Sequence, residues 1–202
     1  MPGYVATIPA WFPTRKAAQV TAFFAQRAGG AINVLRATKL IYLADRRSMA
    51  IRDHLITGDN FVSMPFGPVN TYIYSYMNGQ ASDRIEKWAE FIGPRVGNEI
   101  PLMRPIKIDD LDELSRAEIQ VLEDTWLQFS DIDRFELAEW THRFCPEWRD
   151  PHGSSIPIDF ATVFKRLNKE DPIELAEEIQ AERSLSLELA GGGDDVHPVQ
   201  RG

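Results

Sequence analysis

The sequence lacks most patterns that reveal chemistry from residue spacing alone. Its single cysteine, Cys145, excludes an intramolecular disulfide framework and fits a reducing compartment. The four histidines form no HxxxH or HExxH pair, so a zinc site of the common types is not expected. A glycine-rich phosphate loop and a nucleophile elbow are also missing. We therefore predict no metal and no cofactor.

Long apolar runs are missing as well. No stretch approaches the roughly 20 apolar residues that a membrane span needs. The N-terminal segment, MPGYVATIPAWFP, has no basic region followed by an apolar one, so it is a poor signal peptide. We expect a cytoplasmic protein that does not bind a membrane. The 202 residues, of which 44% are hydrophobic and 26% charged, are typical of a globular domain with a sizeable core.

Basic charge is scarce at one end of the chain. The net charge is −8, and the segment from Glu170 to Gly202 carries −7 of it, so residues 1–169 are close to neutral. This balance argues against a nucleic-acid partner, because binding phosphates requires Lys and Arg. The acidic segment either contacts a basic partner or is simply a solvated helix and tail, and charge patterning favours the second interpretation.

Helical periodicity dominates the rest of the sequence. We predict helices over residues 14–28, with Thr14 as N-cap, and over 34–52, whose broad apolar stripe suggests a central helix. Residues 61–64 should be extended, and Pro68 should begin a helix that runs over residues 69–78. Turn signals within residues 88–104 predict a β-hairpin.

The second half of the chain also shows helical patterns. Ser115 and Glu118 have capping-box spacing ahead of one helix, and residues 130–144 form the next. A loop over 146–155 and a short helix over 158–167 follow. An acidic helix begins at Asp171-Pro172 and runs to about Glu182, and the alternating residues 184–189 suggest that it then becomes extended.

The predicted fold is mainly α: one compact helical domain with a small β-hairpin element and a C-terminal acidic helix. We predict three parts: a globular domain over residues 1–168, an acidic helical arm over 169–190, and a disordered tail over 191–202.

Three side chains are candidates for catalysis. Asp45 lies within a helix, where aspartate has poor propensity and often has a specific partner. A catalytic or ligand-binding carboxylate is one interpretation; we favour a buried acceptor of backbone N–H groups or a partner of an arginine. His142 and Cys145 could act as base and nucleophile, but packing roles are favoured because no third orienting group is identifiable.

An aromatic segment, TYIYSYM, provides the best indication of a binding surface. Tyr72 and Tyr76 share one helical face and Tyr74 lies roughly opposite. One of these faces belongs to the core. Tyrosine on the other would suit a protein interface, so Tyr72, Tyr74 and Tyr76 mark a candidate partner surface.

Two further motifs stand in order along the chain. KLIYLAD supplies Lys39, Tyr42 and Asp45, and about twenty residues later comes a turn of Phe66, Gly67, Pro68 and Val69. Gly67 provides a backbone geometry closed to other residues, and Phe66 is expected to anchor the turn in the core. A glycine ahead of a helix could also hold an anion, but no lysine lies nearby in the sequence.

These motifs resemble the Panacea, or SocA-like, family over about residues 15–150. The helix motif matches, the turn has phenylalanine where the family has tyrosine, and Thr141-His142 matches a later helix. A Pro-Trp pair typical of the family is interrupted here by Glu147. The family includes antitoxins and an adaptor that delivers a bound toxin to a Clp-type protease.

The resemblance implies a non-enzymatic protein that binds a cognate toxin, encoded by a neighbouring gene, and neutralises it. The alternative of the same kind is a proteolytic adaptor for a Clp-type protease. A small enzyme that uses Asp45, His142 or Cys145 is the third and least favoured hypothesis. The resemblance does not identify the toxin or the face that binds it.

Overall fold

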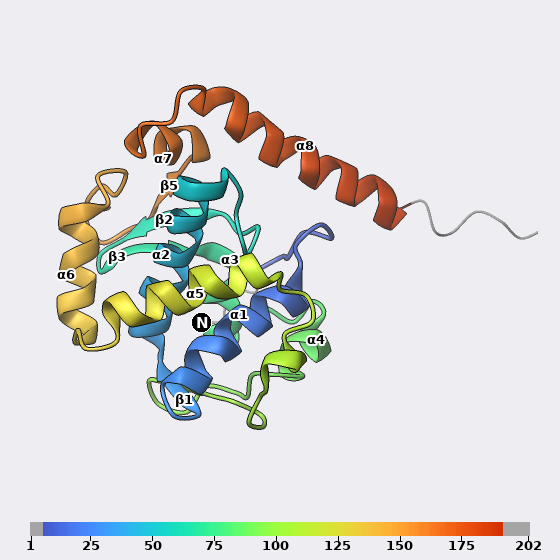
Figure 1. The fold of residues 1–202 in the computed structure, drawn as a ribbon. Helices are drawn as coiled ribbons and strands as arrows, with labels where there is room; N and C mark the ends of the chain where they lie inside the picture. The colour runs from blue at the N-terminus through green and yellow to red at the C-terminus, as the bar shows by residue number, and fades with distance from the viewer. Residues whose placement is uncertain (1–5, 192–202) are drawn as a thin grey trace, which may run out of the picture.

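The computed structural model describes the backbone of residues 6–191 and the side chains of residues 6–189. It is mainly α, as the sequence predicts (Figure 1). In chain order the elements are α1 Thr14–Arg27, β1 Ala31–Asn33, α2 Val34–Arg52, β2 Phe61–Met64, β3 Gly67–Asn70, α3 Thr71–Met77, α4 Ile85–Ala89, β4 Glu99–Pro101, a 3-10 turn Ile108–Asp110, α5 Arg116–Phe129, α6 Arg134–Phe144, β5 Ile156–Ile158, α7 Phe160–Arg166 and α8 Pro172–Gly191.

Helix α2 lies at the centre of the domain, as its broad apolar stripe predicts. It contacts α1, α5 and α6 as well as β3 and α7, and most of its side chains are buried (Figure 1). Asn33 begins the helix, because its side chain accepts a hydrogen bond from the Leu35 N–H at 3.1 Å. The helix ends at Asp53, whose φ of 62° is left-handed. The predicted bounds, 34–52, are those observed.

Two small antiparallel sheets flank this helix. Strand β2 lies between β3 and β5 in one sheet, and β1 pairs with β4 in the other. A two-residue turn, Pro65-Phe66, joins β2 to β3, since Met64 is opposite Gly67 in the register. Strand β5 was not predicted from the sequence; it pairs with β2 although residues 65–155 separate the two strands.

The prediction that Pro68 begins a helix is wrong. Pro68 lies within β3, an edge strand of its sheet, where a proline is tolerated because the missing N–H costs no ladder bond. Helix α3 begins three residues later, at Thr71. The carboxylate of Asp59 sets this start by accepting the N–H groups of Tyr72 at 3.0 Å and Ile73 at 2.9 Å.

Other predictions near helix ends were also wrong. Thr14 is the first residue of α1 rather than its N-cap, and its hydroxyl lies 3.2 Å from that of Tyr76. Helix α6 begins at Arg134, four residues later than predicted, because Asp133 caps it through the Phe135 N–H at 2.8 Å. The capping box of Ser115 and Glu118 before α5 is confirmed.

The segment predicted as a hairpin, residues 88–104, folds back on itself only partly. Antiparallel bridges join Ile92 to Leu102 and Val96 to Glu99, but the regular strand β4 pairs with β1 from elsewhere in the chain. The beginning of the segment belongs to α4 instead.

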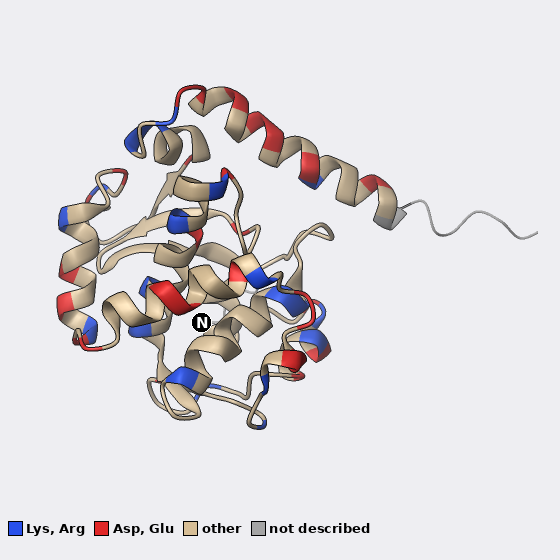
Figure 2. Cartoon of the chain, in the orientation of Figure 1, with Lys and Arg blue, Asp and Glu red and all other residues tan. Residues whose placement is uncertain are grey.

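Helix α8 lies against α7 and then extends past the body of the molecule (Figure 1). The extended structure predicted for residues 184–189 is wrong: the helix continues, and the hydroxyls of Ser184 and Ser186 donate to carbonyls four residues earlier. The tail predicted as disordered lies outside the described residues from 192 on. Acidic side chains line much of α8 (Figure 2).

A single basic side chain, Arg183, fixes α8 to the body. Its guanidinium donates to the carbonyls of Gly58 at 2.6 Å and Asp59 at 3.1 Å and to the side chain of Asn60 at 2.9 Å. The same group lies over the Trp11 ring at 4.2 Å and the Phe160 ring at 4.9 Å. The arm is therefore docked by Arg183 in addition to its packing on α7.

Between residues 6 and 191, no helix has both the length and the apolar character that crossing a bilayer demands.

Candidate functional site

The ammonium group of Lys39 is the most unusual feature of the central helix. The residue is 0% exposed, although lysine is rarely buried without a charged partner. Its Nζ donates to the Pro68 carbonyl at 2.8 Å, which is the one hydrogen bond found for it among the described residues. Burial lowers the pKa of Lys39 to about 7. An amine with spare donors thus lies directly behind β3.

Gly67 allows β3 to approach this lysine. Its φ is +100°, and a Cβ placed on it would lie 3.2 Å from Lys39 Nζ and closer still to Thr141 Oγ1 than real Cβ atoms come. Thr141 is itself buried on α6. The three segments that carry the family resemblance, on α2, β3 and α6, therefore meet at this point.

His142 and Trp148 extend the same meeting place to the end of β2. Their rings stack at 4.0 Å, and Trp148 Nε1 donates to the Met64 carbonyl at 2.9 Å. His142 Nε2 is buried and has no hydrogen-bond partner among the described residues. This arrangement fits the packing role that the sequence favours for His142.

Asp45, one and a half turns after Lys39, is fully enclosed and bonded. Its carboxylate accepts from the backbone N–H groups of Ile56 at 2.7 Å and Thr57 at 2.9 Å, from the Thr57 hydroxyl at 2.5 Å, and from Asn70 Nδ2 at 2.6 Å. Burial raises the pKa of Asp45 in spite of these bonds. The carboxylate joins α2 to the following loop and to β3, and it has the geometry of a buried acceptor.

Two further buried carboxylates were not recognised in the sequence. Asp59 caps α3, and burial raises its pKa to about 7. Glu147, taken only as an interruption, is 3% exposed and accepts from the Tyr42 hydroxyl at 2.5 Å and Arg46 Nε at 2.6 Å. The four-residue spacing of Tyr42 and Arg46 on one helical face was the available signal.

Cys145 is fully buried, and burial raises the pKa of its thiol to about 12. At neutral pH it stays protonated and is a poor nucleophile. In the described part of the chain, Asp45 forms no hydrogen bond with His142 or with Cys145. Nor do His, Cys, Asp and Glu side chains gather in groups of three or more that could hold a metal within the described residues.

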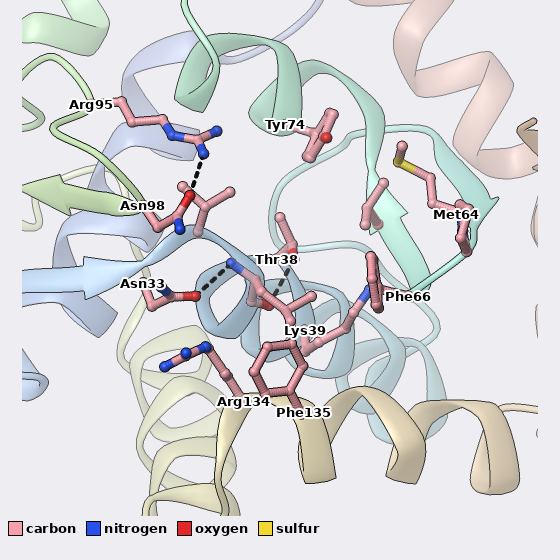
Figure 3. Close-up of a pocket in the computed structure, with 14 residues that line it drawn as sticks. Asn33, Thr38, Lys39, Met64, Phe66, Tyr74, Arg95, Asn98, Arg134 and Phe135 are labelled. Carbon is pink, nitrogen blue, oxygen red and sulfur yellow. Dashed lines mark hydrogen bonds between the residues drawn. The ribbon is translucent and has the colours of Figure 1, made fainter. Parts of the chain in front are cut away.

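An open pocket of about 350 Å³ adjoins the buried lysine (Figure 3). Its wall is made by the start of α2, the β2–β3 hairpin, α3, the loop before β4 and the start of α6. The lining residues are Asn33, Val34, Leu35, Thr38, Lys39, Met64, Pro65, Phe66, Val69, Tyr74, Arg95, Asn98, Arg134 and Phe135. We call this the hairpin pocket. Pockets that hold small ligands or anchoring side chains are of this size and are similarly apolar.

Aromatic residues lie at the edge of the hairpin pocket. Phe66 is 59% exposed, so the expectation that it anchors the turn in the core is wrong; it stands at the tip of the hairpin. Phe135, at the start of α6, is 54% exposed. Large exposed aromatics beside an apolar hollow are typical of a protein interface.

The tyrosines of α3 differ in their surroundings. Tyr76 is buried and stacks on Trp88 at 4.9 Å, while Tyr72 is half-buried against Phe12. Tyr74 is also half-buried and is the member of the three that lines the hairpin pocket (Figure 3). The structure therefore brings Tyr74, Lys39, Phe66 and Val69 together and leaves Tyr72 and Tyr76 on the other side of α3.

Comparison with known proteins gives one family. Residues 38–149 match the family described as antitoxin SocA-like, Panacea domain. No curated protein and no solved structure matches the chain. The matched residues run from the second turn of α2 to the residue after Trp148. They include the buried lysine, the β2–β3 hairpin and α6, and they cover more than half of the sequence. The chain belongs to the SocA-like Panacea family.

Proposed function

We propose that this protein is an antitoxin that neutralises a cognate toxin, encoded by a neighbouring gene, by direct protein–protein binding in the cytosol. Membership of an antitoxin-like family supports a protein partner. The observation that carries the proposal is the hairpin pocket, whose edge holds two large exposed aromatic side chains. Such side chains contribute much of the binding energy of protein interfaces.

The proposal makes the protein a binder rather than an enzyme. The three residues that the sequence offers as candidates for catalysis are a carboxylate whose bonds all go to neighbouring loops and β3, a histidine stacked on a tryptophan, and a protonated thiol in the core. Each is explained by packing. Catalysis would need a base or nucleophile that faces a cleft.

Growth of cells that express each flanking gene, with and without this chain, tests the proposal. We expect one neighbour to stop growth, co-expression to restore it, and the two proteins to co-purify. A frameshifted copy of the gene controls for effects of the transcript. If no neighbour is toxic, or if the toxic one is rescued without any complex between the two proteins, direct neutralisation is rejected.

A proteolytic adaptor is the second candidate, because α8 extends past the body and acidic residues occur along it (Figures 1 and 2). We treat residues 169–190 as a separate arm in this hypothesis. Removing residues 188–202 shortens the arm and leaves Arg183 one turn inside the remaining helix, so that its contacts are expected to persist. An adaptor that uses the arm should then still bind the toxin but leave it with a longer half-life in cells. An unchanged half-life would exclude this role for the removed residues.

A further inference from the structure

The charge of the hairpin pocket is opposite to that of the whole chain. The protein has 30 acidic and 22 basic residues, yet the pocket lining contains Lys39, Arg95 and Arg134 and no Asp or Glu. Figure 3 shows the two arginines on either side of the start of α2. Cations around an apolar hollow create a positive potential that attracts an anionic group.

Neither arginine forms an ion pair with a carboxylate among the described residues, although the charge of Asp133 is attracted to that of Arg134. Arg95 donates to the Gly97 carbonyl at 2.6 Å, to the amide oxygen of Asn98 at 2.7 Å and to that of Asn78. The guanidinium of Arg134 lies over the ring of Phe135, 4.8 Å from its centre. Asp133, the nearest acidic residue in sequence, turns its carboxylate to the Phe135 N–H to cap α6.

Lys39 lies buried behind these arginines, and its ammonium group has N–H donors that are not used. Lys39 Nζ has three possible hydrogen bonds and makes one, to Pro68, among the described residues. Its pKa, lowered to about 7 by burial, would rise again beside an anion, so binding an acid would bring a proton onto the lysine. An anionic occupant would gain more from this group than a neutral one, because a hydrogen bond between two charged partners is the stronger kind.

The geometry points to a specific occupant, and this inference rests on the proposed function. We propose that the hairpin pocket binds a segment of the partner protein in which a large apolar side chain lies next to one or more carboxylates. The apolar side chain fills the hollow between Leu35, Val69 and Tyr74, and the carboxylates meet Arg95 and Arg134 at its edge. A basic or purely apolar segment does not satisfy these cations.

The test is a selection of displayed random dodecapeptides on the immobilised full-length protein. The selected sequences should pair Asp or Glu with Phe, Leu or Trp. The strongest of them, made as a synthetic peptide, should bind at least tenfold more weakly to the Arg95→Glu, Arg134→Glu double variant, and more weakly at 300 mM than at 50 mM salt.

A matched variant controls for the change in net charge. Arg116 and Arg149 are exposed, their side chains make no hydrogen bond within the described residues, and neither lines the pocket. Arg116→Glu with Arg149→Glu therefore changes the charge by the same amount and should bind the peptide as the unmodified protein does. Peptides that lack acidic residues, that bind both double variants equally, or that fail to be enriched would overturn the proposal.

The two proposals can fail separately. If the pocket variant no longer binds the peptide but still rescues growth from a toxic neighbour, the pocket is not the toxin contact, and direct neutralisation stands on another surface. If the unmodified protein rescues no neighbour, the antitoxin proposal fails, and acid-selective peptide binding would then show a pocket that serves a different partner. Loss of both rescue and peptide binding in the pocket variant alone supports both.

Discussion

Two buried ionisable groups lie six residues apart on α2, and they differ in how many hydrogen bonds they make. Asp45 has four hydrogen bonds and joins three parts of the chain. Lys39 is as deeply buried but has one bond, to a carbonyl, and adjoins an open pocket. A fully bonded buried charge stabilises one arrangement of the chain, whereas an incompletely bonded one costs stability and leaves capacity for a ligand. We infer that the first group is structural and the second belongs to the site.

Removing the carboxylate should have the largest effect. Asp45→Ala leaves two backbone N–H groups and the Thr57 and Asn70 side chains without their acceptor, so we expect a loss on the order of 4 kcal/mol in the free energy of unfolding. Urea unfolding followed by circular dichroism measures it. Asp45→Asn keeps the volume and one oxygen acceptor and should lose about half as much. A loss below about 1 kcal/mol for the alanine variant would contradict the structural role.

The burial of Lys39 should make the free energy of unfolding depend on pH. Its pKa is about 7 in the folded protein and 10.5 as a free side chain, so the unfolded chain binds more protons between these values. The free energy of unfolding therefore rises with pH in this window, by about 3 kcal/mol between pH 7 and pH 10. Lys39→Met should remove this contribution. If the free energy of unfolding changes with pH in the same way for both proteins between pH 7 and pH 10, Lys39 is not held uncharged.

Alanine substitutions at two glycines distinguish the cost of crowding beside Lys39 from the cost of backbone strain. Gly67 and Gly29 have φ of +100° and +96°, but a Cβ on Gly29 meets nothing within 4 Å, whereas one on Gly67 meets Thr141 and Lys39. Gly67→Ala should cost about 3 kcal/mol and Gly29→Ala about 1 kcal/mol. Thermal unfolding of both variants checks the difference. Equal losses would mean that β3 can move away from α2 freely.

The arm contains a half-buried charge, Arg183, and its removal should have the smallest effect on the body. Arg183→Ala removes three hydrogen bonds and two ring contacts, which we expect to cost about 2 kcal/mol. Hydrogen exchange should accelerate in α8 and stay unchanged in α2. Arg183→Lys keeps the charge but not the planar group. Its exchange rate in α8 should lie between those of the unmodified protein and Arg183→Ala. Faster exchange in both helices would show that the arm is part of the core.

Local signals in the sequence predicted the central helix and one helix start correctly. The bounds of α2 follow from its apolar stripe, and the capping box before α5 is a short-range pattern. The errors arise where distant segments decide. Pro68 resembles a helix start until β2 is known to pair with β3, and β5 is stabilised by a strand far away in the chain.

The candidate site was only partly visible for the same reason. The family motifs indicated which residues to examine, but lysine is normally exposed, and the burial of Lys39 depends on a carbonyl of β3 and on the absence of a side chain at Gly67. In the sequence, Glu147 and Asp59 have no feature that sets them apart. Their roles follow from hydrogen bonds that Tyr42 and Arg46 donate to Glu147 and that the start of α3 donates to Asp59. Each requires a contact between segments that sequence spacing does not reveal.

The position of Arg183 gives the arm a built-in reporter of its own state. Between Lys169 and Arg201 it is the one residue after which trypsin cuts. While the guanidinium lies between Trp11 and Phe160, a protease cannot accommodate it, so cleavage at this bond requires that α8 first leave the body. The rate of that single cut, measured with and without a partner, reports directly whether binding holds the arm down or releases it.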